Sequence, residues 1–174
     1  MREIETKRLF LRKLRKDDAE SIFRNWASDS EVAKYVTWSA HKDINETKAI
    51  LDMWLAEYDN DNCYRYGIEN QADGELIGMI DVVGYHHENP VIGYCSCRRY
   101  WGNGYMTEAL GVVMKELAED GYRTFVIEAV EENIASNRVI EKNGFQLVGK
   151  RADRLSEMKP QVVTINSYRY YVDR

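Results

Sequence analysis

The first third of the chain contains one apolar segment followed by two helical patterns. Residues 4–14 include a short apolar run, and we expect a strand there. Asp17 with Glu20 three residues later resembles a capping box and predicts the start of a helix. Asp43 with Glu46 gives a second such signal. The residues that follow at helical spacing are Ile22, Phe23 and Trp26 in the first helix, and Ile44, Thr47, Ile50, Leu51, Trp54 and Leu55 in the second.

After Cys63 the pattern changes to the period of two that is typical of strands. Residues 64–68 alternate, residues 72–75 (Ala-Asp-Gly-Glu) supply a turn, and residues 76–85 form a second strand-like run. We therefore expect a hairpin over residues 64–85. Residues 91–97 predict another short strand.

The second half of the chain alternates helices and strands. Gly121 and Gly144 stand where a glycine ends each of two helices. The expected elements are a helix over 104–120, a strand over 124–130, a helix over 135–143, and strands over 145–148 and 162–172. This order predicts the α/β class with a mixed α+β sheet, a largely antiparallel central sheet flanked by helices, in a single domain over residues 1–174.

Composition and charge exclude several classes of protein. Hydrophobic residues make up 44% and charged residues 30% of the chain, which favours a globular enzyme over a disordered protein. The net charge of −5, without a run of Lys or Arg, argues against nucleic-acid binding and favours a basic partner such as an amine. No segment approaches the roughly 20 apolar residues that span a bilayer, so we expect no membrane partner.

The cysteines and histidines do not form a recognisable framework. Cys63, Cys95 and Cys97 are odd in number, and with three histidines they lack metal-ligand spacing. The N-terminus lacks the apolar core of a signal peptide. We therefore expect a cytoplasmic protein with no metal site, in which Cys95 and Cys97 are small buried side chains rather than nucleophiles.

The segment from Arg99 to Ala109 carries the clearest chemistry. It leaves a predicted strand and enters a predicted helix, whose first backbone N–H groups lack helical partners. These groups and the helix dipole favour an anion, and Gly102 and Gly104 let the backbone approach it closely. A pyrophosphate fits this environment, although two glycines also suit a plain tight turn. The segment matches neither the phosphate loop that ends in Gly-Lys-Ser/Thr nor the three-glycine dinucleotide fingerprint.

The same segment resembles the Arg/Gln-x-x-Gly-x-Gly/Ala motif of the GNAT superfamily of N-acetyltransferases, matched by Arg99, Gly102 and Gly104. The closest similarity is to the branch that contains the ribosomal-protein-alanine N-acetyltransferases. The further segments that resemble this branch are 6–9, 34–38, 92–94, 107–110 and 133–145. The resemblance therefore extends over nearly the whole chain.

The resemblance implies acetyl-CoA as the cofactor, bound in a cleft where two neighbouring strands of the sheet splay apart. The pyrophosphate would accept hydrogen bonds from the backbone N–H groups of residues 101–107. The pantetheine arm would pair with the backbone of residues 94–96. A backbone N–H there would stabilise the tetrahedral oxyanion. The implied cofactor-binding residues are Tyr94, Cys95, Ser96, Arg99, Trp101, Gly102, Asn103, Gly104, Tyr105, Met106, Thr107, Asn133, Ser136 and Asn137.

The implied reaction is direct attack of a neutral amine on the thioester within a ternary complex, which needs a proton acceptor and a donor for the thiolate. Family members often place a tyrosine acid where this chain has Ile140, and in the similar branch a serine substitutes for it, matched by Ser136. Ser136 also suits a helix N-cap. Val91 replaces the glutamate of many relatives, which leaves His86 as a candidate base. The alternatives are His87, Glu88, Asp81 and a water chain.

The predicted function is acetyl transfer from acetyl-CoA to a primary amine, either a protein N-terminus or a small amine. Tyr35 and Trp38 are expected to line the acceptor pocket, or else to pack as ordinary aromatic residues. Loss of the acid and base positions leaves a non-catalytic acyl-CoA sensor as an alternative. An unrelated nucleotide-binding module is a third reading, and both a monomer and a homodimer fit the sequence.

Overall fold

The computed structural model describes residues 1–172, which form two compact units. One consists of residues 1–81 and 94–105, and the other of residues 82–93 together with residue 106 onward. Hydrogen-bonded strands follow the order β1-β2-β3-β4-β5-β6-β8-β7. The expected mixed, largely antiparallel sheet with flanking helices is therefore confirmed, while the single domain over 1–174 stays a prediction.

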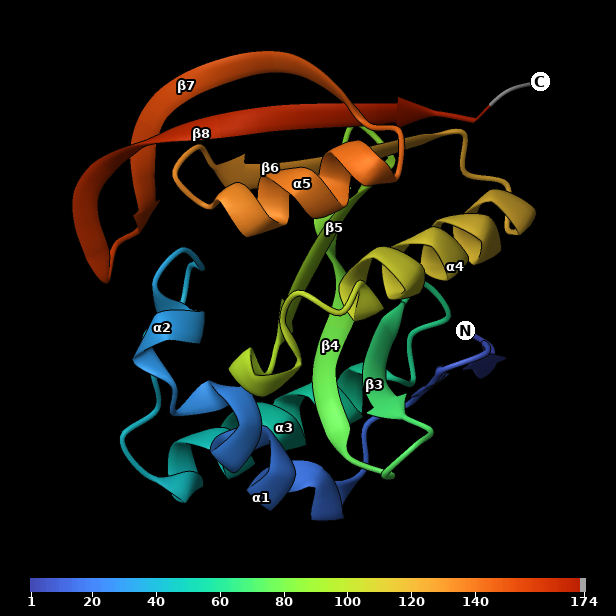
Figure 1. Cartoon of the computed structure of the whole chain (residues 1–174), viewed down its shortest axis with the longest axis vertical. Coiled ribbons are helices and arrows are strands. Elements are labelled where there is room, and N and C mark those ends of the chain that lie inside the picture. Colours follow the sequence, from blue (N-terminus) through green and yellow to red (C-terminus); the bar gives the residue numbers. More distant parts are fainter. Residues whose placement is uncertain (173–174) are drawn as a thin grey trace. The chain divides into compact units, whose positions relative to one another are not determined.

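The first unit combines short strands with several helices (Figure 1). Its elements are β1 (Ile4–Glu5), β2 (Leu9–Arg12), the 3-10 turn η1 (Lys16–Asp18), α1 (Ala19–Ile22), the π turn η2 (Phe23–Ala27), α2 (Ser30–Ala33), α3 (Ile44–Glu57), β3 (Arg65–Asn70), the first part of β4 (Leu76–His86), the last part of β5 (Asn89–Ser96), and the 3-10 turn η3 (Arg98–Tyr100). β2, β3 and β4 pair antiparallel in sequence order, so the predicted hairpin is present.

Two expectations for the N-terminal segment were wrong. The predicted strand over 4–14 is interrupted by a tight turn, in which the Thr6 hydroxyl accepts a hydrogen bond from the Leu9 backbone N–H at 2.9 Å. The predicted capping box at Asp17 and Glu20 is replaced by Asp18, whose carboxylate accepts the Arg15 N–H at 2.7 Å. Asp18 takes this position because its carboxylate also accepts hydrogen bonds from a buried arginine.

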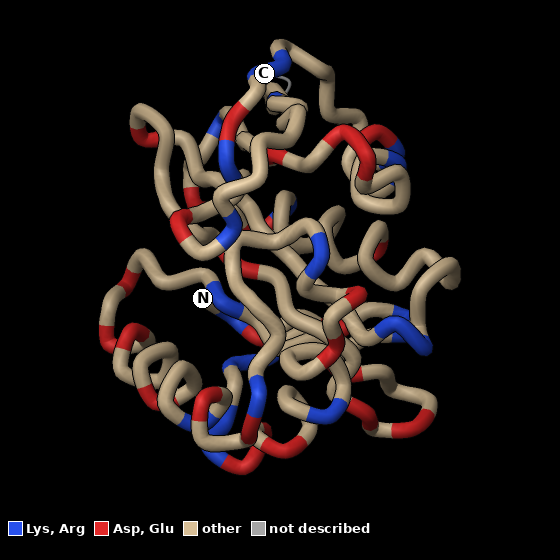
Figure 2. The backbone as a smooth tube through the Cα atoms, turned by 90° about the vertical axis from the view of Figure 1, so that its left-hand side faces the viewer, with Lys and Arg blue, Asp and Glu red and all other residues tan. Residues whose placement is uncertain are grey.

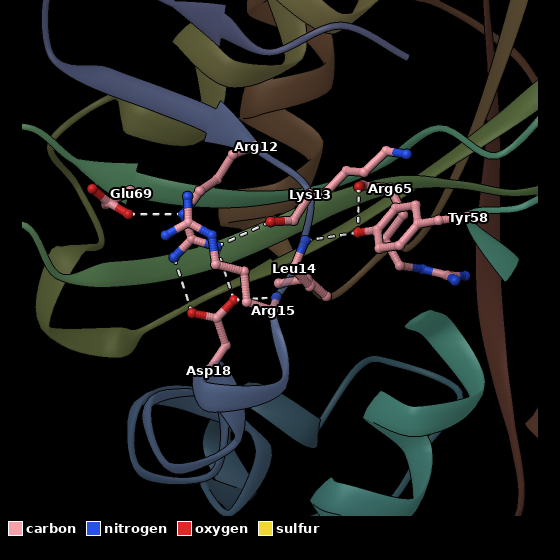
Figure 3. Close-up of polar contacts among 8 residues, drawn as sticks. All are labelled: Arg12, Lys13, Leu14, Arg15, Asp18, Tyr58, Arg65 and Glu69. Carbon is pink, nitrogen blue, oxygen red and sulfur yellow. Dashed lines mark hydrogen bonds and ion pairs between the residues drawn. The ribbon is translucent and has the colours of Figure 1, made fainter. Parts of the chain in front are cut away.

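That arginine is Arg12, which is 5% exposed and lies in a polar cluster shown in Figure 3. Its guanidinium donates two hydrogen bonds to Asp18, at 2.8 and 2.9 Å, and one to Glu69 at 2.9 Å. The hydrogen bonds to Asp18 raise the pKa of Arg12, with burial opposing them. In the same cluster the Tyr58 hydroxyl accepts the Leu14 N–H at 2.9 Å and donates to the carbonyl of Arg65 at 2.8 Å.

Helix α3 starts as predicted, because the Asp43 side chain accepts the Asn45 N–H at 2.7 Å. Its apolar face packs into the core of the first unit. The buried residues of that core are Leu14, Ala19, Ile22, Trp26, Ala27, Val32, Leu51, Leu76 and Met79. Trp54 and Leu55 of α3 pack against them, as the helical spacing predicted.

The second unit contains the tips of β4 and β5, most of α4 (Tyr105–Glu119), β6 (Thr124–Val130), α5 (Ile134–Lys142), β7 (Gln146–Ser156) and β8 (Lys159–Tyr171) (Figure 1). β5 pairs in parallel with β6 at Val91 and Val126, and β8 pairs antiparallel with both β6 and β7. Gly121 and Gly144 adopt φ of +102° and +81°, as expected for glycines that end helices.

Strand β7 is much longer than predicted, and β8 begins three residues before its predicted start and ends one residue before its predicted end. Residues 149–161 gave no strand signal, because β7 is exposed over most of its length and a strand with two solvated faces has no apolar alternation. The strands are instead held by their mutual ladder and by ion pairs such as Arg151 with Glu128 on β6, at 2.5 and 2.8 Å.

Acidic and basic residues are interspersed along the backbone (Figure 2). None of the helices within residues 1–172 combines the length and apolar content that a bilayer crossing demands. Among the same residues, no group of three His, Cys, Asp or Glu side chains comes together in a way that could hold a metal ion.

Candidate active site

The junction between β5 and α4 has the backbone geometry that an anion site requires. After η3 the chain turns at Gly102 and Gly104, with φ of +78° and +76°, and enters α4 at Tyr105. Asn103 closes the turn, because its side-chain N–H groups donate to the carbonyls of Tyr100 at 3.2 Å and Trp101 at 3.1 Å. Residues 101–104 are exposed, so the loop before the helix N-terminus is open to a ligand.

Side chains of η3 anchor this loop to the rest of the first unit. The Arg98 guanidinium lies 3.1 Å from the Asp29 carboxylate. The Tyr100 hydroxyl donates to Asp73 at 2.7 Å and accepts from Arg99 at 3.0 Å. The hydrogen bond from Tyr100 lowers the pKa of the Asp73 carboxyl, which therefore stays charged. The motif arginine, Arg99, is thus part of a surface network beside the loop.

Arg8 also lies at this loop, and the sequence reasoning assigned it no role. Its Nη1 donates to the carbonyl of Asn103 at 2.9 Å, and its guanidinium carbon lies 4.6 Å from the centre of the Tyr105 ring. The resemblance over residues 6–9 was the one signal that pointed to this segment. It gave no reason to place Arg8 beside a loop that follows 95 residues later.

The strand residues expected beside the cofactor, Tyr94–Ser96, lie at the end of β5 and are half-buried. Trp101 donates its indole N–H to the carbonyl of Ser96 at 2.9 Å, which joins this strand end to the loop of residues 100–105, the anion loop. Burial raises the pKa of the Cys95 thiol and nearby Asp81 raises it further, so the thiol stays protonated. Cys97 is buried as expected, whereas Cys95 is half-buried rather than buried.

In the second unit, the predicted cofactor-binding residues Asn133, Ser136 and Asn137 lie at the start of α5. Asn133, not Ser136, is the N-cap, because the Asn133 side chain accepts the Ser136 N–H at 3.2 Å. The alternative of Ser136 as the cap is therefore wrong, and its half-buried hydroxyl lies within the first turn.

Asn137 is buried, and its amide is fully used inside the protein. Its N–H groups donate to the carbonyls of Val130 at 2.9 Å and Asn133 at 2.7 Å, and its oxygen accepts from Asn166 at 2.9 Å and Tyr168 at 2.7 Å. An amide has two donors and two acceptor positions, so these bonds occupy them. The geometry fits a positioning role at the junction of β6 and α5.

His86 lies at the tip of the β4–β5 hairpin and is exposed. The next two residues, His87 and Glu88, form the turn with φ of +48° and +65°. Along β5 the five residue-to-residue steps from Asn89 to Tyr94 span roughly 17 Å at 3.3–3.4 Å per step. The tip is therefore distant, along the strand, from the residues expected to face the thioester.

Among the alternative bases, Asp81 is buried and bound to an arginine, and both features affect the pKa of its carboxyl group. It is 7% exposed on β4, and its carboxylate accepts the Arg65 Nε–H at 3.0 Å. Arg65 also bonds Glu57 and lies 5.2 Å from the Trp54 ring. Burial raises the pKa of Asp81, with Arg65 opposing the shift.

Tyr35 and Trp38 both follow α2 in the first unit and are half-buried. Trp38 packs against the hydrophobic core and lies 6.0 Å from the ring of His41. Tyr35 has the ammonium of Lys34 at 5.1 Å from its ring. Trp38 therefore has the packing role of the alternative interpretation, and lining of an acceptor pocket stays a prediction for both residues.

Comparisons with known proteins agree with this geometry. The model of the acetyltransferase (GNAT) domain matches residues 8–146. The chain is 33% identical over 152 residues to the uncharacterized N-acetyltransferase YoaA of Bacillus subtilis, with 84% of each chain covered.

Solved structures show the same fold. RimL, a ribosomal alpha-N-protein acetyltransferase in complex with coenzyme A, superposes with a TM-score of 0.86 at 22% identity, with 99% of each chain covered. The microcin self-immunity acetyltransferase MccE, in complex with acetyl-CoA and AMP, gives a TM-score of 0.85 at 20% identity, with 96% of this chain and 94% of that chain covered.

The family implied by the motif residues is thereby confirmed, together with acetyl-CoA as its cofactor. From its matched domain and its similarity to an N-acetyltransferase over most of both chains, this protein belongs to the GNAT family and is an acetyl-CoA-dependent acetyltransferase.

Proposed function

We propose that this acetyltransferase acts on the primary amine of a protein N-terminus or of a small molecule, by direct attack on the bound thioester. The observation that carries the proposal is the exposed turn at Gly102 and Gly104, which leads into the N-terminus of α4. Backbone N–H groups there suit the diphosphate of acetyl-CoA, the donor that the family uses.

The rest of the donor site is proposed from the same resemblance. Residues 101–107 would bind the diphosphate, and the backbone of residues 94–96 would pair with the pantetheine arm. A backbone N–H of this strand end would stabilise the oxyanion, an interaction that is typically worth about 3–4 kcal/mol. Asn133 and Ser136 would line the pantetheine channel, with Asn137 holding the local backbone.

One hydrogen-bond donor and one proton acceptor complete the proposed mechanism. Ser136, half-buried in the first turn of α5, would donate a hydrogen bond to the departing thiolate. The acceptor amine would lose its proton to a base, and the observations favour Asp81 over His86. A buried carboxylate of raised pKa accepts protons nearer to neutral pH, whereas His86 lies on an exposed hairpin tip.

Peptide N-termini are the first acceptors to test, because RimL, which has the same fold, is an alpha-N-protein acetyltransferase. Polyamines, aminoglycosides and free amino acids are the second group. The net charge of −5 favours encounter with the acceptors of this panel that carry a net positive charge. The free thiols of Cys63, Cys95 and Cys97 suit a reducing compartment, and we place the enzyme in the cytoplasm.

A thiol-release assay with acetyl-CoA and this panel of amines tests the function, with calorimetry for CoA binding and mass spectrometry of the products. We expect one acetyl group on the acceptor for each CoA released. Tight CoA binding without turnover on any acceptor class would favour the non-catalytic sensor. Absence of CoA binding would overturn the proposal.

The base is tested with Asp81→Asn and His86→Gln. We expect Asp81→Asn to lower kcat/KM by about 100-fold and to abolish its rise with pH, as removal of a general base typically does. Asp81→Glu, which keeps a carboxylate beside Arg65, should restore part of the activity. Loss of activity and of the alkaline rise in His86→Gln, but not in Asp81→Asn, would reverse the assignment.

A further inference from the structure

The Thr6–Leu9 turn fixes the direction of Arg8. The Thr6 N–H donates to the carbonyl of Leu9 at 2.9 Å, and the Thr6 hydroxyl accepts from the backbone N–H of Arg8 at 3.3 Å and of Leu9 at 2.9 Å. The turn is therefore closed by both backbone and side-chain hydrogen bonds. These bonds fix the backbone of Arg8, from which its side chain extends.

Gln71, in the turn between β3 and β4, holds the same segment from outside. Its side-chain N–H groups donate to the carbonyls of Thr6 at 2.7 Å and Leu9 at 2.9 Å, and its backbone N–H donates to the carbonyl of Arg8 at 2.9 Å. One residue thus binds three carbonyls of a four-residue turn.

The Arg8 side chain makes its contacts within the anion loop. It donates to the carbonyl of Asn103, lies over the ring of Tyr105, and its Nη2 lies 3.7 Å from the position that a Cβ on Gly104 would occupy. These three consecutive residues are the ones that lead into α4. A guanidinium here fixes the loop and adds a full positive charge to the helix N-terminus.

The turn that holds Arg8 also holds the other end of the loop. Asp73, two residues after Gln71, accepts a hydrogen bond from the hydroxyl of Tyr100 at 2.7 Å. Residues 71–73 therefore fix the loop at Tyr100 directly and at Asn103–Tyr105 through Arg8. A loop held at both ends before ligand arrives loses less conformational freedom on binding.

We propose that Arg8 is a positioning residue for the cofactor, which holds the loop of residues 100–105 in its diphosphate-binding conformation and supplies positive charge to it. The inference rests on the proposed diphosphate site and adds a residue outside the recognised motif. Its consequence is confined to donors that carry a diphosphate. A donor without the nucleotide half has nothing for this loop to bind.

The test compares Arg8→Gln with Lys7→Gln, which removes the same formal charge from the same turn. Each variant is assayed with acetyl-CoA and with S-acetyl-N-acetylcysteamine, a thioester that lacks the diphosphate. We expect Arg8→Gln to raise the Kd for CoA and the KM for acetyl-CoA by about 10- to 100-fold, with little change in kcat, because a charge-assisted contact is lost. Its kcat/KM with the truncated donor should stay within about twofold of the wild type.

Arg8→Lys separates charge from geometry, because it keeps the cation but loses the planar fork and the contact with Tyr105. We expect an intermediate KM. Equal losses with both donors in Arg8→Gln, or an unchanged Kd for CoA, would overturn the proposal. Calorimetry of the wild type distinguishes failure of the Arg8 proposal from failure of the proposed diphosphate site. If the wild type does not bind CoA, the diphosphate site itself is refuted. Thermal unfolding of each variant identifies a loss that comes from misfolding.

Discussion

Gly78 on β4 lies where the backbone of β5 passes unusually close. A Cβ at this position would lie 2.5 Å from the carbonyl oxygen of Cys95 and 3.0 Å from the Cα of Ser96. Ordinary contact begins at 3.4 Å, so the first distance is short by 3.4 − 2.5 = 0.9 Å. Both obstructing atoms belong to backbone, which cannot rotate away, so Gly78→Ala must displace the strand end.

The displaced residues are those proposed to pair with the pantetheine arm. Overpacking of this kind costs about 1–3 kcal/mol, which lowers Tm by roughly 2–12 °C in a chain of this size. A shift near 1 Å in a binding segment can cost about 100-fold in rate. We therefore expect Gly78→Ala to unfold at a lower temperature and to lose at least about tenfold in kcat/KM for acetyl-CoA.

Gly84→Ala is the matched control, because it adds the same methyl group to the same strand with no heavy atom within 4 Å. It should leave kcat/KM unchanged and Tm equal to or slightly above that of the wild type. Thermal unfolding and steady-state kinetics of the two variants provide the comparison. A Gly78→Ala enzyme with wild-type Tm and kinetics would refute the steric reasoning. Loss of stability with unchanged kinetics would refute the role of the Cys95–Ser96 backbone.

Three further predictions concern buried polar groups. Tyr58→Phe should cost about 1–3 kcal/mol in urea unfolding, because a buried backbone N–H loses its acceptor. Burial raises the pKa of Tyr58 to about 12, so the wild type should lose stability between about pH 10 and pH 12, as only the unfolded chain ionises, and the variant should lose less. Asn137→Ala should cost about 3 kcal/mol by the same measurement, since it removes a fully bonded buried amide. Asp18→Asn should cost about 3–5 kcal/mol by leaving the charge of Arg12 poorly compensated, whereas exposed Asp17→Asn should cost under about 0.5 kcal/mol.

Local signals in the sequence predicted much of the fold. The strand over Thr124–Val130 has the predicted bounds, because its β-branched residues favour a strand and turn residues flank the run. The helix predicted over residues 104–120 is present as α4, with bounds that differ by one residue at each end. The start of α3 at Asp43 depends on a hydrogen bond between residues that are two positions apart in the sequence. These features depend on neighbours in sequence, which is why a pattern can predict them.

Other features depend on residues that are distant in sequence. The first predicted helix begins differently because Asp18 is bound by Arg12. The long β7 strand has no apolar alternation, and its length is set by the partner strand. Asn137 matched a cofactor motif by position, yet its hydrogen bonds are to the protein itself.

The sequence by itself determined the place of the anion loop, because the glycines and the following helix lie within a few residues of each other, and the resemblance of its motifs implied the family and the cofactor. Tertiary structure alone decided which residues hold that loop. Arg8 and Asp73 reach it from 95 and 27 residues away along the chain, through contacts made only after the strands pair. Pairing of distant strands sets these neighbours, and no local pattern encodes which surface turn will lie beside which loop.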